Sequence, residues 1–566
     1  MKRAHAMPFG AEPGAGGVRF RLWAPAQQRV VLDLDGIHHA MHPLEQGWHE
    51  LLLAQARPGD RYRYVLADGL AVADPASRAN PDDVHGASEV IDPRAYAWRD
   101  DGWRGRPWHE AVAYELHLGS FTPEGTFAAA RGKLPELAAL GITALELMPV
   151  ADFPGKRNWG YDGVLPFAPD ASYGRPEELK KLVDEAHALG LMVLLDVVYN
   201  HFGPEGNYLH AYCPQFFDPA RHTPWGAAID FSRRAVRDFF VHNALYWVEE
   251  FRFDGLRLDA VHAIRDDSAE HIVCEIGRAL RAGPGRGREL HLVLENDANQ
   301  AHLLGRCARA QWNDDLHHVL HVLATGEADG YYADYAQAPL ERLGRALAEG
   351  FVYQGEPSPF RDGAPRGEPS AHLPPTAFVS FDQTHDQVGN RAFGERLDAL
   401  AEPAAVEAAL GCVLLAPQVP MLFMGEEFAA RTPFQFFCDF GPELAAAVTR
   451  GRRGEFERFA SFAQEIPDPN DPATFLASKL QWQERDPQRI ALVRELLAAR
   501  RRHLVPRLAG ARSGTYSIRA GALHVAWPLG GGARWRMSCR PGGGAPMPAG
   551  EPVYRSAALC VALEAA

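Results

Sequence analysis

Acidic, histidine and amide side chains follow four separate apolar runs in this sequence. The runs are short and rich in Leu and Val, as is typical of strands that are buried on both faces. Helix capping alone does not need carboxylates at the ends of four unrelated strands. We therefore expect these residues to meet at one rim of a barrel, where the carboxyl ends of the strands lie together. They are Asp196, Asn200, His201, Arg257, Asp259, Glu295 and the stretch Asp382–Gln387.

Two carboxyl groups that flank one point suit the cleavage of a glycosidic bond, one as nucleophile and the other as general acid. Arg257 lies two residues before Asp259 on the same strand face, so its charge would lower the pKa of Asp259 and keep it ionised. Glu295 ends an apolar run, where partial burial would raise its pKa and keep it protonated. A retaining mechanism predicts a separation of about 5 Å between the two carboxyl groups. We expect Asp386 and His385 to bind the ring hydroxyls. Aromatic side chains expected beside the rim are Trp159, Tyr161 and Tyr199.

Eight short apolar runs alternate with helical segments between residues 106 and 500. Eight buried strands with intervening helices predict an α/β fold of the (β/α)8 TIM-barrel type. The rival, a doubly wound sheet, does not need eight strands, and no glycine fingerprint follows the first run. Helices are predicted at 134–140 and 176–189, each followed by a glycine suited to a helix C-terminus. The predicted strands are 111–117, 144–149, 191–198, 253–259, 291–295, 310–313, 376–381 and 419–424.

Two β-domains are predicted to flank the barrel. Residues 1–105 contain alternating apolar and polar runs between Gly and Pro clusters, which predicts a carbohydrate-binding-like β-sandwich. Residues 501–566 predict a small C-terminal β-domain. The catalytic segment at 106–500 exceeds the ~250 residues typical of this barrel, and the excess is assigned to a long loop at 201–230, a predicted lid or substrate wall. Four aromatic residues of the N-terminal domain could bind sugar, although core packing is the more expected role: Trp23, Trp48, Tyr62 and Tyr64.

The composition excludes some classes of partner. The chain of 566 residues has a formal net charge of −14, which argues against nucleic acid and is compatible with a neutral sugar. No apolar signal region follows Met1, and the most apolar stretch, 408–424, is short for a membrane span, so we predict a cytoplasmic protein without a membrane partner. Seven cysteines, an odd number without a CxxC pair, predict reduced, packed thiols rather than a disulfide framework. Nothing in the sequence indicates an oligomeric state.

Other catalytic motifs are weak or absent. The Gly-Lys pairs at 132–133 and 155–156 lack the flanking residues of a phosphate-binding loop, and no Gly-x-Ser-x-Gly motif occurs. His317 and His321 have the spacing of two zinc ligands on a helix, but no HExxH motif accompanies them. We predict neither a metal nor a cofactor, because glycoside cleavage by two carboxyl groups needs none.

The residues at the predicted rim resemble the four motif regions of the α-amylase superfamily, in the same order. The matching stretches are Asp196–His201, Gly255–Ala260, Glu295 and Phe381–Asp386. The resemblance implies that Asp259 is the nucleophile, Glu295 the general acid/base and Asp386 a carboxylate that acts in the transition state. One departure is Thr384, where the family often has Asn before the His-Asp pair. The resemblance further implies substrate-binding roles for Tyr161, Asn200, His201, Arg257, His385 and Gln387.

Further stretches of the sequence resemble one group of superfamily members. These enzymes hydrolyse, with retention, the α-1,4 bond next to the terminal trehalose unit of a malto-oligosaccharide. His262, three residues after Asp259, is the predicted residue for selecting trehalose. The alternatives are a branching or debranching enzyme of the same superfamily, and a glycan-binding protein on an inactive barrel. Retention of all three carboxylates argues against the inactive barrel. The matching stretches are 158–163, 294–297, 310–315, 367–375 and 424–427.

Overall fold

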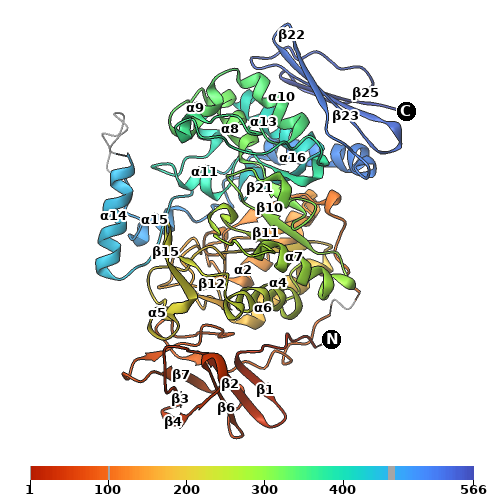
Figure 1. The fold of residues 1–566 in the computed structure, drawn as a ribbon. Helices are drawn as coiled ribbons and strands as arrows, with labels where there is room; N and C mark the ends of the chain where they lie inside the picture. The colour runs from red at the N-terminus through yellow and green to blue at the C-terminus, as the bar shows by residue number, and fades with distance from the viewer. Residues whose placement is uncertain (1, 100–101, 457–465, 566) are drawn as a thin grey trace.

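The computed structural model describes residues 2–99, 102–456 and 466–565. A central barrel lies between two β-domains, with the N-terminal and C-terminal strands on opposite sides of it (Figure 1). This is the architecture predicted from the sequence. The barrel strands carry the polar residues that form the candidate site at their C-terminal ends.

Eight parallel strands close the barrel in sequence order. Every residue in them is buried, because side chains fill the interior and helices cover the outside. All eight predicted strands are confirmed, with ends that differ by at most a few residues. The strands are β10 (Ala113–Leu116), β11 (Ala144–Leu147), β14 (Met192–Val197), β17 (Gly255–Leu258), β18 (His291–Leu294), β19 (Ala310–Trp312), β20 (Phe378–Ser380) and β21 (Val419–Phe423).

Helices connect the strands and form the outer layer (Figure 1). Both predicted helices are confirmed, as α3 and α4. Gly141 and Gly190 follow them with φ angles of 118° and 77°, a conformation that glycine adopts without strain. The helices before β19 are α1 (Leu118–Phe121), α2 (Phe127–Arg131), α3 (Leu134–Leu140), α4 (Pro176–Ala188), α5 (Leu209–Tyr212), α6 (Arg234–Glu250) and α7 (Ile272–Ala282). Those after it are α8 (Asp314–Thr325), α9 (Ala333–Ala336), α10 (Pro339–Glu349), α11 (His385–Gly389), α12 (Leu397–Leu400), α13 (Pro403–Leu415), α14 (Pro442–Phe456), α15 (Pro472–Ala477) and α16 (Pro487–Ala499).

The residues beyond a minimal barrel are spread over several connections. The predicted long loop at 201–230 is present and contains α5 and the antiparallel hairpin of β15 (Phe217–Thr223) and β16 (Gly226–Ile229). A second hairpin, of β12 (Ala151–Asp152) and β13 (Leu165–Pro169), follows β11, and α14 and α15 follow β21. The prediction that all of the excess lies in one loop was therefore wrong. The sequence pattern did not single out these added elements.

The N-terminal domain consists of two antiparallel sheets, as predicted. Tyr62 and Tyr64 are buried in its core, where their hydroxyls donate to the same Asp74 oxygen at 2.7 and 3.2 Å. One sheet has the order β1 (Gly10–Gly14), β2 (Gly17–Trp23), β6 (Trp48–Leu53) and β5 (His42–Pro43). The other has the order β4 (Ile37–Ala40), β3 (Val31–Leu34), β7 (Arg61–Val65) and β8 (Ala71–Val72), and β9 (Ser88–Glu89) also pairs with β7.

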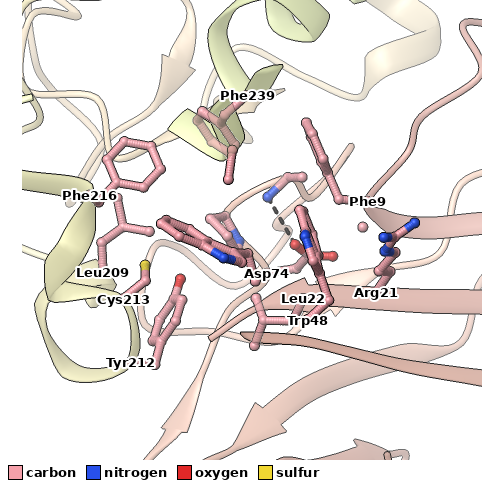
Figure 2. Close-up of a pocket in the computed structure, with 15 residues that line it drawn as sticks. Phe9, Arg21, Leu22, Trp48, Asp74, Leu209, Tyr212, Cys213, Phe216 and Phe239 are labelled. Atoms are coloured by element: carbon pink, nitrogen blue, oxygen red, sulfur yellow. Dashed lines mark hydrogen bonds between the residues drawn. The ribbon is translucent and has the colours of Figure 1, made fainter. Parts of the chain in front are cut away.

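A small apolar cavity of about 30 Å³ lies within the interface between the N-terminal domain and the 201–230 segment (Figure 2). Trp23 and Trp48 line it from the sandwich, and Tyr212 and Phe216 line it from the segment. The Ala26 N–H donates to the Tyr212 carbonyl at 3.1 Å across the same contact. The two tryptophans therefore lie at a domain interface, and the first half of the predicted lid packs against the N-terminal domain.

The C-terminal domain is a single antiparallel sheet that packs on the barrel helices. Trp527 donates from its indole to the Leu347 carbonyl of α10 at 2.9 Å, and Trp535 donates to the Leu415 carbonyl of α13 at 2.7 Å. Both indoles are completely buried. The strand order is β22 (Thr515–Arg519), β23 (Ala522–Pro528), β24 (Arg534–Cys539), β26 (Leu559–Glu564) and β25 (Glu551–Arg555).

One prediction about the cysteines was wrong, because the structure contains a disulfide between Cys274 and Cys307. The bond joins α7 to the segment before β19, a contact that spacing along the chain does not reveal. The other five cysteines are free and buried, as predicted. Over the described ranges, no helix combines the length and apolar character that crossing a bilayer requires.

Arg500, which follows α16, ties the barrel helices to β21. Its completely buried guanidinium donates to the carbonyls of Leu414, Ala416 and Gln418 at 3.1, 2.5 and 2.6 Å. Arg500→Met would leave these carbonyls unsatisfied, so we expect a loss of about 3 kcal/mol in unfolding free energy. Thermal denaturation followed by circular dichroism measures this loss. The exposed neighbour gives the control, Arg501→Met; equal midpoints for the two variants would contradict the assignment.

Candidate active site

Arg257 lies at the centre of the acidic cluster and is completely buried on β17. Its Nη1 donates to Asp196 Oδ2 at 2.6 Å and to Asp259 Oδ1 at 2.9 Å. Its Nη2 lies 3.9 Å from Glu295 Oε2. The guanidinium carbon lies 4.1 Å from the centre of the Trp312 ring on β19. Carboxylates that follow or end three different strands thus surround one cation, as the sequence predicted.

The backbone turn after β17 links the two principal carboxyl groups. The Asp259 N–H donates to the Val197 carbonyl of β14 at 3.1 Å. The next residue, Ala260, has the left-handed angles φ 39° and ψ 49°, which are costly for a residue with a side chain. Its N–H donates to Glu295 Oε2 at 2.5 Å. This strained turn therefore holds Glu295 next to Asp259.

Glu295 has a carboxyl group whose pKa is shifted by its surroundings. Burial is the largest influence on its carboxyl group and raises its pKa well above the ordinary value. The Arg257 charge opposes this increase, whereas the negative charges of Asp259, Asp314 and Asp386 add to it. Glu295 therefore carries a proton at a pH where an ordinary glutamate is ionised.

A second cation lies beside the acidic cluster. His385 Nδ1 lies 2.5 Å from Glu115 Oε1 on β10, and its backbone N–H donates to the other Glu115 oxygen at 3.0 Å. Burial alone would lower the pKa of His385, but the charges of Glu115 and Asp386 raise it to about 9. The Tyr161 ring stacks on the imidazole with ring centres 5.0 Å apart. His385 is therefore charged at neutral pH.

Tyr161 and His201 close another side of the site. The Tyr161 hydroxyl donates to Asp196 Oδ2 at 2.6 Å, and its carbonyl lies 3.0 Å from His201 Nε2. Burial raises the pKa of Asp196 to about 6, against the lowering effect of Arg257. Trp225, at the tip of the β15–β16 hairpin, stacks on His201 with ring centres 4.4 Å apart. Its half-exposed indole brings the predicted wall segment to the edge of the site.

Asp386 is the most accessible of the three carboxylates. Its side chain is 45% exposed, whereas those of Asp259 and Glu295 are each 13% exposed. The Thr384 hydroxyl accepts from the Asp386 N–H at 3.3 Å and also contacts the Gln387 side chain. Thr384 therefore caps the start of α11 and supplies a local hydrogen bond at the position where the family pattern departs.

Three other predicted residues lie near the cluster. His262 Nδ1 accepts from the Asp297 N–H at 3.3 Å, beyond Glu295. Asn200 is buried, and its side-chain amide has no hydrogen-bond partner among the described residues. The Trp159 ring meets the edge of His385 at 5.5 Å. These positions agree with contacts at the margin of the site.

Two predicted rim residues point elsewhere. The Tyr199 hydroxyl donates to Asn243 at 2.6 Å, so the ring belongs to the packing of α6 behind the strands. Asp382 is buried against the Glu426 carboxyl group, which follows β21. The predictions for Tyr199 and Asp382 were wrong, because strand alternation and short turns orient both side chains away from Arg257.

Sequence reasoning did not single out the acidic floor of the site. Glu115 and Glu146 are opposite one another on β10 and β11. Burial, the largest influence, raises the pKa of Glu146 to about 8. The available signal was a single carboxylate inside each of two otherwise apolar strands.

The zinc alternative has no support within the described residues, where no group of three or more His, Cys, Asp or Glu side chains suits a metal ion. His317 Nδ1 lies 2.6 Å from the Asp382 carbonyl, and its Nε2 lies 3.2 Å from the Tyr332 hydroxyl. His321 contacts Glu327 at 2.7 Å. The ring nitrogens of His317 are thus occupied by protein hydrogen bonds.

Comparison with known proteins places the chain in a family. It matches the α-amylase catalytic domain over 101–215 and carbohydrate-binding module 48, the isoamylase N-terminal domain, over 8–76. A malto-oligosyltrehalose trehalohydrolase from Deinococcus radiodurans is 44% identical over 502 residues, 86% of this chain and 82% of the relative. The crystal structure of a putative α-amylase from Salmonella typhimurium has a TM-score of 0.95 and 45% identity, covering 99% of this chain and 100% of the other. A 1,4-α-glucan branching enzyme from Burkholderia thailandensis is 36% identical but covers only 45% of this chain and 34% of its own length. This chain therefore belongs to the malto-oligosyltrehalose trehalohydrolase family, within the α-amylase superfamily of glycoside hydrolases.

Proposed function

We propose that this protein is a retaining glycoside hydrolase that cleaves the α-1,4 bond next to the terminal trehalose unit of malto-oligosyltrehalose. The products are trehalose and a malto-oligosaccharide. The observation that carries the proposal is the contact of Arg257 with Asp259 at 2.9 Å and its approach to Glu295 at 3.9 Å. One cation thus contacts the Asp259 carboxyl group and lies near a second carboxyl group, Glu295, whose pKa burial raises.

The proposed reaction uses Asp259 as the nucleophile and Glu295, whose pKa is raised, as the proton donor. In the first step, the Asp259 carboxylate attacks the anomeric carbon while the bond to the leaving oxygen breaks and Glu295 gives that oxygen its proton. In the second step, the Glu295 carboxylate takes a proton from water. The resulting hydroxide oxygen bonds to the anomeric carbon and displaces Asp259. The sugar keeps its anomeric configuration after two displacements.

The remaining side chains are proposed to hold the substrate. Asp386, the exposed carboxylate, and charged His385 bind the hydroxyls of the reacting glucose ring, and Tyr161 stacks on its face. His262 accepts a hydrogen bond from Asp297, two residues after Glu295. In this position it is proposed to contact the trehalose leaving group. The other proposed substrate contacts are Asn200, His201, Arg257 and Gln387.

The domain limits and the location of the protein stay predictions. We propose the N-terminal sandwich at 1–105, the catalytic barrel at 106–500 and the C-terminal β-domain at 501–566. The match to a carbohydrate-binding module over 8–76 supports the first of these. A cytoplasmic location is proposed with them.

Substitution of the two principal carboxyl groups tests the mechanism. We expect Asp259→Asn to reduce kcat by at least about 10³-fold because it removes the nucleophile. Glu295→Gln should reduce kcat by about 10²–10⁴-fold because it removes the proton donor. With an α-glucosyl fluoride, whose leaving group needs no proton, the first step of Glu295→Gln should recover. The matched control is Glu289→Gln. Glu289 precedes the N-terminal end of β18, whereas Glu295 follows its C-terminal end. Near-normal turnover in either site variant would refute the assignment.

The pH dependence of kcat/KM tests whether Glu295 donates a proton or only contributes to packing. Because the pKa of Glu295 is raised, its proton is present below that pKa and is lost as the pH rises through it. The wild-type kcat/KM should therefore fall on the alkaline side, and this fall should be absent in Glu295→Gln. An unchanged alkaline limb in the variant would assign the proton donor to another group.

The Glu115–His385 pair predicts a measurable pKa change. Burial favours neutral His385, and Glu115 reverses this preference. We expect Glu115→Gln to lower the pKa of His385 from about 9, so that the imidazole is neutral at pH 8. Histidine NMR titration gives the value, and Glu110→Gln, which alters a glutamate paired with Arg106 instead, is the control. A pKa that stays at about 9 in Glu115→Gln would exclude this source of the charge.

Product analysis distinguishes the proposed substrate from others of the superfamily. Incubation with maltosyltrehalose should release free trehalose, which chromatography detects. Incubation with amylopectin should leave the branch frequency unchanged. Altered branching without trehalose release would indicate a branching or debranching enzyme, and binding of both glucans without any product would indicate an inactive barrel.

A further inference from the structure

Two free cysteines meet where the barrel joins the C-terminal sheet. Cys412 lies on α13, and Cys539 is the last residue of β24. Their exposed fractions are only 1% and 6%, yet both line a cavity of about 370 Å³ between α8, α10, α13 and the C-terminal domain. This cavity is remote from the carboxylates of the proposed site, which lie at the ends of the barrel strands.

Close packing of α13 on the sheet brings the cysteines together. A Cβ atom added to Gly411 would lie 2.5 Å from Leu559 Cδ2 of β26, so the helix approaches the sheet more closely than a larger residue permits. Cys539 and Leu559 are direct partners in the β24–β26 ladder. Cys412 directly follows Gly411 on this closely packed face of α13, and the Cys412 and Cys539 thiols are near enough for each to shift the pKa of the other.

We infer that Cys412 and Cys539 are a redox modification site, at which a small peroxide converts the two thiols into a disulfide that ties the barrel to the C-terminal domain. The site is separate from the disulfide between Cys274 and Cys307. It is also independent of the proposed hydrolase activity.

The proximity of the two thiols gives them different roles. It lowers the pKa of Cys539, against the effect of burial, and raises the pKa of Cys412. Cys539 is therefore the thiol that loses its proton first and attacks, because the thiolate is the nucleophile. Cys412 remains a thiol beside it and resolves the oxidised intermediate.

The reaction with hydrogen peroxide balances in two steps. The Cys539 thiolate attacks one peroxide oxygen, so an S–O bond forms as the O–O bond breaks, and the leaving hydroxide takes up the proton that Cys539 lost. The Cys412 sulfur then attacks the Cys539 sulfur. An S–S bond forms, the S–O bond breaks, and the second hydroxide leaves as water with the proton of Cys412. The two sulfurs are oxidised by two electrons, and the peroxide is reduced to two waters.

The cavity lining selects the class of oxidant. The lining consists of Leu, Ala, Pro, Gly and Cys residues with one charged group, Glu402. An apolar entrance with a negative charge disfavours a bulky anionic disulfide such as oxidised glutathione. A small neutral peroxide carries no such penalty.

The chain after Cys539 forms a glycine-rich turn at the end of β24. Pro541 is followed by three consecutive glycines, Gly542, Gly543 and Gly544, all with positive φ angles. This turn gives the end of β24 more freedom to shift than the helix has. Cys539 is the last paired residue of β24, between Leu523 and Leu559, so a shift of its side chain toward α13 involves the strand end and this turn rather than the barrel strands.

The test is peroxide treatment of the full-length protein, followed by alkylation of thiols in denaturant and mass spectrometry of a non-reducing digest. We expect the five free thiols to fall to three and a Cys412–Cys539 linked peptide to appear, two hydrogens lighter than its parts. Dithiothreitol should reverse both changes. A digest without this linked peptide, or with Cys539 oxidised only to sulfinic acid, would overturn the inference.

Serine variants identify the attacking thiol. In Cys412→Ser, we expect Cys539 to stop at sulfenic acid, which dimedone traps, and in Cys539→Ser we expect Cys412 to stay reduced. Cys560→Ser, another buried cysteine in the same sheet, is the matched control and should form the linked peptide as the wild type does. Dimedone labelling of Cys412 in Cys539→Ser would contradict the assigned roles. The wild-type digest stands by itself if a variant does not fold.

Discussion

The buried positive charge of Arg257 is the constraint on which the acidic centre depends. A desolvated guanidinium needs acceptors or negative groups around it, and here carboxyl groups from three strands supply them. Asp196 and Asp259 contact it at 2.6 and 2.9 Å, whereas Glu295 is 3.9 Å away. The more distant group gains less from the cation and is buried, so it retains its proton. Burial and the distance from one cation thus together favour the protonated form of Glu295.

At the floor of the barrel, a second pair of carboxyl groups also differs in its contact with a cation. Glu115 and Glu146 are opposite one another on adjacent strands. Glu115 bonds charged His385, whereas Glu146 has a pKa of about 8, set mainly by burial. The site therefore contains two buried cations, Arg257 and His385, each in contact with a carboxyl group. A neutral sugar can enter such a site without disturbing the charge balance that holds it together.

The strands and most of the rim could be predicted because both depend on local sequence. Apolar runs of four to eight residues mark buried strands, and a carboxylate after the run marks the C-terminal end. Glu115 and Tyr199 show the limit, because the direction of each side chain depends on strand register and on packing of distant helices. The Cys274–Cys307 pairing and the spread of extra helices likewise arise from contacts between segments far apart in the chain.

The packing of the 201–230 segment against the N-terminal sandwich has a further consequence. Phe216 is pressed between Trp23 of the sandwich and Phe239 of α6, and the chain continues directly into the hairpin that carries Trp225 to His201. The N-terminal sandwich thus supports one wall of the active site by direct packing, independently of any glycan binding. An enzyme shortened to its barrel would lose this support. Aromatic side chains that now pack at the domain interface, such as Phe216 and Phe239, would then be exposed to water.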